Sequence, residues 1–523
     1  MTTSVTSSRN GEFLAALRAE WTKFRSVRGW MIALVFAGLM IVLFTYLQAN
    51  GKHEGYCTTP NPSSCVTGHP FVPTGPGGEA VADTFRFVAH PLIGNGTITA
   101  RMTSLTGRIW AGPANEAPSL ADTRTGVTAW AKAGLLLTPS TKQGSAYAAI
   151  MATGGHGVRF QDDYTYDQTG LPGPILGAAP RWLRLTRTGD TITGYDSTDG
   201  TTWRRIGSAH LSDLPNRVDV GLFATSPVTY GGSATQTTAN FDHVAVDPGA
   251  TVSTAPGGWL GHSIGTGPDD FYATLGTGSD QRSADSFAVT GSGDIAPAVA
   301  LAGGDTASDS LLFGLVVAVI FLIVIGTMFI TTEYRRGLIR TTFAATPSRS
   351  SVLAAKVVVV GLGGFAVGAV AAAAAIPLAQ HVMNGNGDYV FPAGPFAMVR
   401  TIAGSGALVA LTAIAALGIG TILRRSAGTI LLGVVVFVLP TFTGPGIIGP
   451  TSSGSVATWL YRVTPAAGFA VLGLLPRSGL VSYPYTMANG YYPLPPWAGL
   501  LVLCAYAAVA LAVARFLLLR RGA

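Results

Sequence analysis

Few residues of this 523-residue chain are arranged as catalytic groups usually are. The string "GHSIG" at 261–265 matches the G-x-S-x-G pattern of many hydrolases, with Ser263 as the nominal nucleophile. That pattern requires a strand before the serine and a helix after it, whereas "PGGWL" and "GTGPDD" flank it here. Paired carboxylates in an E-x-D-x-x-E string, as glucanases use, do not occur. The sequence therefore favours a protein that is not an enzyme.

Cofactor and metal sites are equally poorly indicated. Asp162, Asp163 and Asp167 carry the oxygen ligands that calcium prefers, but they lack EF-hand spacing, and a solvated acidic loop is the better prediction. No G-x-x-x-x-G-K-[ST] phosphate loop occurs, so this chain is not expected to hold ATP itself. We expect no cofactor and no metal on this chain.

A short basic stretch, "TTEYRRGLIRTTFAATPSRSSVLAAK" at 331–356, is the most distinctive polar string outside the central segment. An excess of basic residues on one side of a membrane accounts for its arginines. It does not account for the order of Glu333, Tyr334, Arg335, Arg336 and Arg340. These five residues are our candidates for contact with a partner.

The elements that flank this stretch are apolar. Six stretches contain no Asp, Glu, Lys or Arg, namely 29–51, 310–332, 357–387, 401–423, 426–461 and 478–514. Each holds the roughly 20 apolar residues that a helix needs to cross a hydrocarbon core about 30 Å thick. We therefore predict an integral membrane protein with spans at about 29–49, 310–332, 352–380, 398–423, 427–447 and 497–519.

The charges follow the sides of a membrane. The short segments next to the spans on one side hold 15 Lys/Arg against three acidic residues, whereas residues 52–309 hold 15 Lys/Arg against 22 Asp/Glu. Basic residues mark the cytoplasmic side, so both termini are expected in the cytoplasm and the large segment outside the cell membrane. Nucleic acid is excluded as a partner, because its footprint gathers basic residues on one domain face.

The N-terminal segment, residues 1–28, has one apolar stripe. Leu14, Leu17, Trp21 and Phe24 recur at three-four-three spacing, with charged residues around them. This pattern predicts an amphipathic helix in the inner membrane interface.

Two of the three cysteines, Cys57 and Cys65, lie just outside the first predicted span in a stretch rich in Pro and Ser. An oxidising compartment there favours a local disulfide, although two unpaired thiols remain the alternative. Cys504 lies in the last predicted span and is interpreted as a small apolar filler.

Residues 75–250 show the alternation of an antiparallel β-sandwich. The strings that carry it include "TFRFVAH", "GTITARMTSL", "KAGLLLTPS", "RWLRLTRTGDTITGYDSTDGTTWRRIG" and "VDVGLFATS". In order and composition they resemble the concanavalin-like sandwiches, which include laminin-G-like members. The string at 286–295 looks like that family's opening strand but comes last. It either completes the sandwich or is a remnant of a second copy. The resemblance implies glycan binding, for which exposed Trp residues would be the usual tools. The simpler interpretation is that Trp182 and Trp203 fill the core.

The membrane part resembles a second family. "LRAEWTKFRSVRGW" at 17–30, the loop from Glu333 to Lys356 and the six spans are similar to type-2 ABC exporter permeases of the actinobacterial kind. That resemblance implies a separate ATPase subunit, carrying ATP and magnesium, that contacts the loop after the second span. It also implies a dimer of permeases and a short re-entrant helix, for which 466–475 is the match.

The sequence thus predicts a mixed fold: a six-helix transmembrane bundle with an all-β jelly-roll sandwich of the concanavalin-like type inserted between the first two spans. The domains are the cytoplasmic segment 1–28, the first span 29–49, the outer domain 50–308 and the bundle 309–523. The predicted function is that of an exporter permease subunit in the cell membrane, whose outer domain recognises a ligand, cell-wall component or partner. The alternative is a membrane-anchored glycan receptor without transport activity.

Overall fold

The computed structural model describes residues 3–51, 55–57, 65–67, 72–112, 120–173, 179–229, 233–248, 258–265, 278–283, 286–298, 304–345, 348–442, 455–475, 478–481 and 492–520. The chain divides into two compact units. The helical unit comprises Met1–His53, Asp305–Arg477 and Tyr485–Ala523. The β unit comprises Glu54–Gly304 and Ser478–Pro484.

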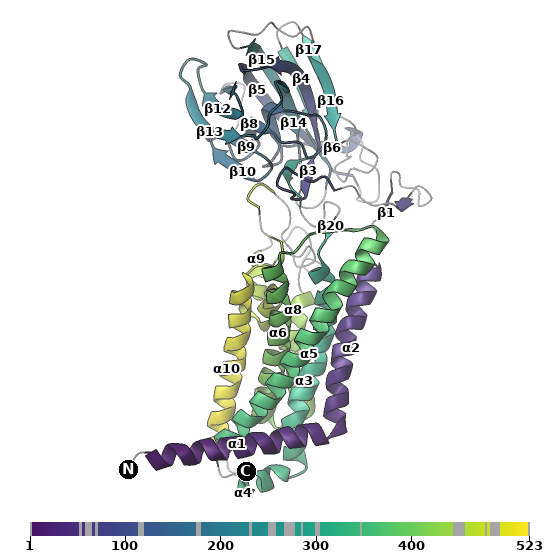
Figure 1. Ribbon diagram of the computed structural model, residues 1–523, viewed down its shortest axis with the longest axis vertical. Coiled ribbons are helices and arrows are strands. Elements are labelled where there is room, and N and C mark those ends of the chain that lie inside the picture. The colour runs from purple at the N-terminus through teal and green to yellow at the C-terminus, as the bar shows by residue number, and fades with distance from the viewer. Residues whose placement is uncertain are drawn as a thin grey trace. The chain divides into compact units, whose positions relative to one another are not determined.

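Five helices of the helical unit are long and apolar enough to cross a membrane. They are α2 (Arg28–Gly51), α3 (Ala307–Arg335), α5 (Arg349–Asn386), α6 (Pro395–Leu423) and α10 (Pro496–Arg520). Figure 1 shows these helices side by side as a bundle. Helices suit such apolar sequences because each backbone polar group is paired within its own segment.

The helical unit contains further elements besides these five helices. They are α1 (Thr3–Ser26), α4 (Leu338–Ala345), α7 (Ser426–Phe437), α8 (Leu439–Phe442), α9 (Ser455–Val463) and the 3-10 helix η3 (Pro465–Leu472); a two-residue strand, β21, covers Tyr389–Val390. The predicted re-entrant segment at 466–475 overlaps η3, whose eight residues are all buried.

The predicted span at 427–447 differs from the other five. In its described part, up to residue 442, it forms α7 and α8 rather than one long helix. Twelve residues of α7 cover about 18 Å at about 1.5 Å per residue, less than the roughly 30 Å of a hydrocarbon core. Within the described ranges, five helices therefore reach spanning length, and the sixth span stays a prediction.

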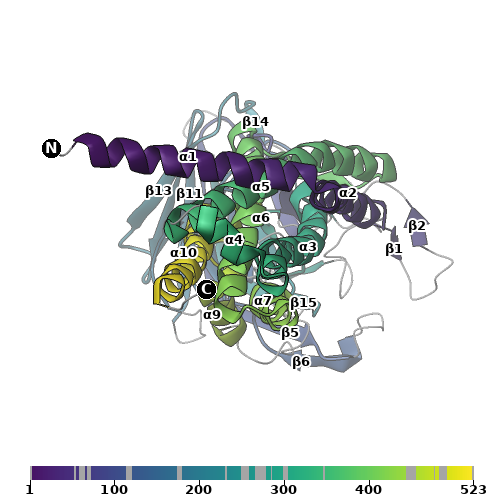
Figure 2. The same ribbon diagram turned by 90° about the horizontal axis from the view of Figure 1, so that it is seen from below.

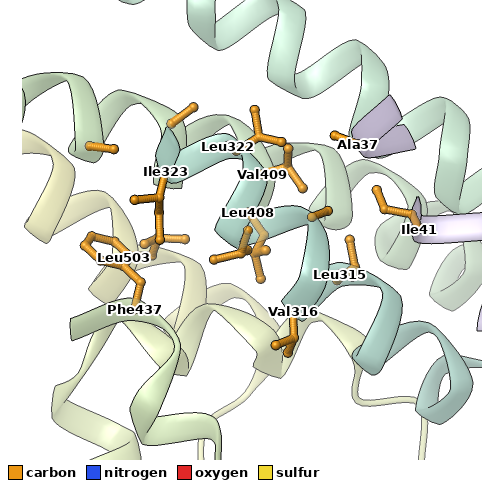
Figure 3. Close-up of a cluster of buried hydrophobic side chains, with 14 of the residues drawn as sticks. Ala37, Ile41, Leu315, Val316, Leu322, Ile323, Leu408, Val409, Phe437 and Leu503 are labelled. Carbon is orange, nitrogen blue, oxygen red and sulfur yellow. The ribbon is translucent and has the colours of Figure 1, made fainter. Parts of the chain in front are cut away.

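The core of the bundle is built from side chains of several helices, some of which are drawn in Figure 3. Ile41 of α2, Leu322 of α3, Val409 of α6, Phe437 of α7 and Leu503 of α10 are all buried in one cluster. Apolar positions thus recur on the inward face of each helix, which fixes how the helices pack.

Two glycines allow helix backbones to approach closely. A Cβ added to Gly326 of α3 would lie 2.3 Å from the carbonyl oxygen of Ala413 in α6. One added to Gly314 would lie 2.5 Å from the carbonyl oxygen of Ile41 in α2. Small residues of this kind are how membrane helices gain packing contacts in the absence of a hydrophobic driving force.

Helix α1 lies across one end of the bundle rather than along it (Figures 1 and 2). The same end holds α4, the C-terminal end of α3 and the N-terminal end of α5. We call it the α1 end. Polar residues that are distant in sequence meet there, as described below.

The β unit consists of short antiparallel strands. They are β1 (Gly55–Cys57), β2 (Cys65–Thr67), β3 (Val81–Asp83), β4 (Phe85–Ile93), β5 (Gly96–Trp110), β6 (Thr123–Thr125), β7 (Lys132–Thr138), β8 (Ala148–Thr153), β9 (Val158–Asp162), β10 (Tyr166–Thr169), β11 (Arg181–Thr188), β12 (Thr191–Ser197), β13 (Arg204–His210), β14 (Arg217–Thr225), β15 (Thr235–Pro248), β16 (Leu260–Ile264), β17 (Ser279–Ser283), β18 (Ser286–Gly291) and β19 (Ile295–Pro297). A 3-10 turn, η2, covers Leu120–Asp122, and β20 covers Gly304–Asp305.

Most of these strands form two large sheets that share one core, whereas β1 and β2, and β3 and β19, pair separately. One sheet has the order β10-β9-β8-β7-β14-β4-β16, and the other β13-β12-β11-β5-β15-β18-β17, with β6 beside β5. Leu135 and Leu222 of the first sheet pack in one cluster with Ile98, Leu185 and Phe241 of the second. The predicted antiparallel strands are present, and the meander at 181–207 is β11-β12-β13.

The late string at 286–295 belongs to this core. Its strand β18 pairs with β15 and β17 inside the second sheet, and Phe287 and Val289 are buried. Of the two alternatives left open by the sequence, the structure therefore supports a strand that completes the pair of sheets.

The outer face of the first sheet is also apolar. Phe87, Met151, Phe223, Tyr147 and Tyr164 form a second buried cluster on that side. Because these side chains are covered, this face offers no exposed aromatic ring at these positions for stacking on a sugar.

The two ends of the β unit are joined to each other. Strand β3 near its start pairs antiparallel with β19 near its end, so that Asp83 lies opposite Ile295 and Val81 opposite Pro297. The chain therefore enters and leaves the pair of sheets at neighbouring positions.

Candidate functional site

A closed ring of four charged side chains lies at the α1 end of the bundle. Lys356 of α5 donates to Glu20 of α1 at 2.8 Å and to Glu333 of α3 at 2.9 Å. Lys23 of α1 donates to Glu333 at 2.5 Å and to Glu20 at 3.1 Å. Positive and negative groups alternate, so this charge ring is neutral overall and joins three helices.

Three members of the charge ring are buried. The side chain of Lys356 is 0% exposed, that of Glu20 4% and that of Glu333 6%, whereas that of Lys23 is 39% exposed. Charges are removed from water at this depth only when they are paired. The ring therefore helps to hold α1 on the bundle, and removing any one of its charges leaves a buried group without full compensation.

Aromatic rings surround the buried lysine. The Nζ of Lys356 lies 4.8 Å from the ring centroid of Phe329, on which Phe24 and Trp30 pack edge-on at 5.6 and 5.7 Å. Ring faces attract cations, and the attraction is stronger where water is excluded. The ring of Phe329 thus contacts the fully buried amino group of Lys356, and Phe24 and Trp30 hold that ring in place.

The exposed lysine of the ring keeps its charge. Burial lowers the pKa of Lys23, but the hydrogen bond to Glu333 and the charges of Glu20 and Glu333 outweigh this, and the pKa is raised. The arrangement positions helices rather than supplying an acid or base, because each lysine of the ring is bound to two carboxylates.

Of the five predicted partner-contact residues, three are exposed and two are at least half-buried. Arg335, Arg336 and Arg340 are exposed at the end of α3 and on α4. Tyr334 is half-buried beneath the guanidinium of Arg424, 5.0 Å from its ring centroid. Glu333 is buried in the charge ring, where it can act on a partner only by positioning the arginines that follow it.

The predicted amphipathic stripe is also divided. Leu14 and Trp21 are 52% and 47% exposed, Leu17 is half-buried, and Phe24 is buried against the bundle. Ala16 and Glu20 complete the buried face of α1. The helix thus rests on the bundle along one side and presents Leu14 and Trp21 on another.

The remaining candidates lie in the β unit. Cys57 and Cys65 are opposite residues in the β1–β2 pair, which suits the disulfide that stays a prediction. Ser263 lies within strand β16, where its Oγ accepts a hydrogen bond from Arg86 at 2.7 Å, instead of on a strand-to-helix turn. Among the acidic residues, Asp167 pairs with Arg159.

A second buried ion pair lies in the β unit. Lys132, at the start of β7, donates to Asp294 Oδ1 at 2.8 Å and to the carbonyl oxygen of Ile295 at 2.5 Å. Both side chains are almost completely buried, at 0% and 1% exposure. The pair fastens the segment that leads into β19 onto the first sheet.

We predict a pH effect at Asp162. Burial, reinforced by the charge of Asp163, raises the pKa of Asp162 to about 6. Since the folded-state pKa exceeds the unfolded value of about 3.9, its stabilising contribution is full below about pH 4 and is lost as pH rises through about 6. Asp162→Asn should therefore make the β unit more stable at pH 7 and flatten its pH dependence between pH 4 and 6, measured by hydrogen exchange of β9. The exposed Asp213→Asn should leave both unchanged, and a loss of stability at pH 7 in Asp162→Asn would contradict the assignment.

The sequence did not reveal the charge ring. Glu20, Lys23 and Lys356 read as ordinary charges beside membrane spans, and Glu20 and Lys356 are 336 positions apart. The one available signal was an acidic residue at position 20 and another at position 333 in segments otherwise dominated by basic residues.

Comparisons with known proteins gave few matches. No protein-family model matches it, and no curated protein matches it. A solved structure of a functionally unknown protein from Saccharomyces cerevisiae is 15% identical with a TM-score of 0.21, covering 37% of this chain and 86% of that one. Two structures of scytalido-glutamic peptidase with transition-state analogs are 9% and 10% identical with TM-scores of 0.25 and 0.23, each covering 40% of this chain and 98% of the peptidase. At such TM-scores these likenesses support no inference about activity.

Proposed function

We propose that this chain is the membrane-spanning permease subunit of an ATP-binding cassette exporter. A separate ATPase subunit would hold ATP and magnesium, and two permease subunits would complete the transporter. The observation that carries the proposal is the α3–α4–α5 connection, which places Arg335, Arg336 and Arg340 on an exposed surface directly after the buried Glu333. An ATPase subunit that is to move the spans needs a binding surface attached rigidly to them. The arginines provide such a surface, because they follow a residue that is fixed in the bundle.

The charge ring supports this role. It ties α1, α3 and α5 together next to the arginines, so force applied to α4 would pass to three helices at once. Packed interfaces of this kind transmit displacement because they are not continuously deformable.

The membrane arrangement in this proposal has six spans, with α7 and α8 as the beginning of the fifth. Both termini and the α1 end lie in the cytoplasm, in keeping with the basic residues there. The β unit lies outside the cell membrane as a concanavalin-like jelly-roll sandwich that recognises a ligand, a cell-wall component or a partner.

A pull-down tests the transporter proposal directly. The protein is solubilised in detergent from its native membrane, and the proteins that accompany it are identified by mass spectrometry. An ATPase with a phosphate loop in near-equal amount is the expected result. Its absence, with only envelope glycan or another membrane protein recovered, would overturn the proposal.

The exposed arginines provide a sharper test. Arg336→Ala should weaken recovery of the ATPase by about tenfold, because truncating a central arginine of an interface typically costs more than about 1 kcal/mol. Thermal unfolding should not change, since the side chain is exposed. Arg217→Ala, which removes an exposed arginine of the β unit, is the matched control. Equal ATPase recovery with both variants would remove Arg336, in the turn between α3 and α4, from the interface.

One feature favours the alternative, a glycan receptor without transport activity. On the outer face of the second sheet, the guanidinium of Arg184 lies 3.7 Å from the ring centroid of Trp203, and Tyr195 is paired opposite Arg184. All three are half-exposed, and aromatic and arginine side chains together suit stacking and hydrogen bonding to sugars. Loss of glycan binding in Trp203→Ala, in a protein that recovers no ATPase, would favour this alternative.

A further inference from the structure

The α1 end of the bundle contains one large cavity that the charge ring does not use. It has a volume of about 810 Å³ and lies between the C-terminal ends of α3 and α6 and the N-terminal ends of α4 and α7. Pockets that hold small molecules or headgroups usually fall between about 300 and 1,000 Å³. The cavity is therefore large enough for a ligand with several polar groups.

Its lining is strongly positive. Arg335, Arg340, Arg424 and Arg425 all line it, and none of the described residues around it is acidic. None of these four arginines forms an ion pair with a carboxylate in the part of the chain that the structure describes. Guanidinium groups without a paired carboxylate attract anions, and guanidinium pairs with phosphate in a bidentate geometry.

Helix α7 adds to the positive potential. It begins at Ser426, and both Ser426 and Ala427 line the cavity. Its N-cap residue, Arg425, makes no side-chain capping hydrogen bond, and the first helical bond is that of the Thr429 N–H to Arg425. The first N–H groups of α7 thus have no partner within the helix, and such groups favour negative charge.

The backbone at this point holds the arginines in place. Arg424 ends α6 in a left-handed conformation, with φ of 55°, and α7 starts two residues later. A non-glycine residue adopts this conformation only where its surroundings require it. The turn brings two consecutive arginines to the wall of one cavity.

The position of the cavity favours a phospholipid over a free phosphate as its ligand. Met328 and Thr331, which also line it, belong to the apolar helix α3, so the cavity begins where the apolar span ends. Leu338 and Leu423 beside it are 48% and 42% exposed. A lipid would place its phosphate at the end of the apolar span and its acyl chains along such apolar side chains. A free phosphate would make no contact with those side chains.

We propose that this cavity binds the headgroup of an anionic phospholipid, with the phosphate held by Arg424, Arg425 and the start of α7. A zwitterionic headgroup would bring an ammonium group into a site with four guanidiniums, so a headgroup of net negative charge is preferred. The site requires that the chain lies in a membrane, and it does not depend on an ATPase partner.

The test uses the full-length protein in nanodiscs that contain phosphatidylcholine with increasing fractions of phosphatidylglycerol. Lipid that remains bound after transfer to detergent is counted by native mass spectrometry. The wild type should retain phosphatidylglycerol in preference to phosphatidylcholine. Arg424→Asn combined with Arg425→Gln should weaken this retention about thirty-fold, because each arginine near an anionic lipid contributes about 1 kcal/mol. Asparagine is chosen at 424 because it tolerates the left-handed conformation.

Two further variants keep the test decisive. Arg336→Gln removes a neighbouring exposed arginine that does not line the cavity, and it should retain lipid like the wild type. Arg425→Gln alone alters only an exposed side chain and should weaken retention by several-fold even if the double variant does not fold.

Unchanged retention in Arg425→Gln, or an equal loss in Arg336→Gln, would overturn the site. Displacement of the lipid by inorganic phosphate at equal concentration would show a free-phosphate site instead and would overturn the lipid assignment. A failed ATPase pull-down would leave all these outcomes unaffected.

Discussion

Replacing Lys356 with methionine is expected to destabilise the helical unit by about 3–5 kcal/mol. The substitution leaves the carboxylates of Glu20 and Glu333 in a buried site with only Lys23 to balance them. Breaking a buried ion pair by removing one partner has a cost of this size, because the remaining charge is uncompensated. Helix α1 should separate from the bundle first, since Glu20 is its only buried charge among the described residues.

Thermal unfolding in detergent and hydrogen exchange of the α1 amides measure this effect. Lys23→Met is the matched control: it also leaves two buried carboxylates with one lysine, but the Lys23 side chain is 39% exposed, so water reaches that side of the charge ring and the expected loss is smaller than in Lys356→Met. Adding Glu20→Gln to Lys356→Met should restore part of the stability, because one unpaired carboxylate is removed. Equal losses in Lys23→Met and Lys356→Met would show that burial does not govern the energy of the charge ring.

A comparable loss, about 3–5 kcal/mol, is expected in the β unit for Asp294→Ala. The amino group of Lys132 would be left at 0% exposure with the Ile295 carbonyl oxygen and the face of Trp130 as its remaining contacts. Since the same aspartate also accepts from the Ile295 N–H at 2.8 Å, the segment leading into β19 loses a second contact. Protection of the β3 and β19 amides from exchange should fall most.

The matched control is the half-buried pair formed by Arg101 and Asp242. Their side chains are 32% and 24% exposed, and Asp242→Ala should cost no more than about 1 kcal/mol. Lys132→Met together with Asp294→Ala should recover part of the loss, because no buried charge remains. If Asp242→Ala proved as damaging as Asp294→Ala, depth of burial would not explain the effect.

The sequence predicted the strands well because their signal is local. Alternation along Arg181–Thr188 and Thr191–Ser197, with Asp and Gly at the turns, is sufficient to place a meander. The five long apolar helices were predictable for the same reason, since length and absence of charge suffice. The break at Val438, within the described part of the predicted span at 427–447, was not predictable, because the sequence is apolar on both sides of it.

The candidate site was predictable only in part. Arg335, Arg336 and Arg340 stand out in sequence because they are consecutive or nearly so, and they are exposed. The buried partners of Glu333 come from other helices, and no local pattern reveals which lysine reaches which glutamate. The role expected for Glu333 therefore changes from a contact residue to one that positions the arginines.

The pairing of β3 with β19 has a consequence for how the chain assembles. While the β unit is unfolded, α2 and α3 are the ends of a disordered loop of about 250 residues. Once β3 and β19 pair, only the short stretches on either side separate the two helices. Shortening a loop by two to three halvings lowers the entropic cost of closing it by on the order of 1 to 2 kcal/mol. Folding of the β unit thus favours assembly of the bundle, because bringing α2 and α3 together costs less entropy after β3 and β19 have paired than before.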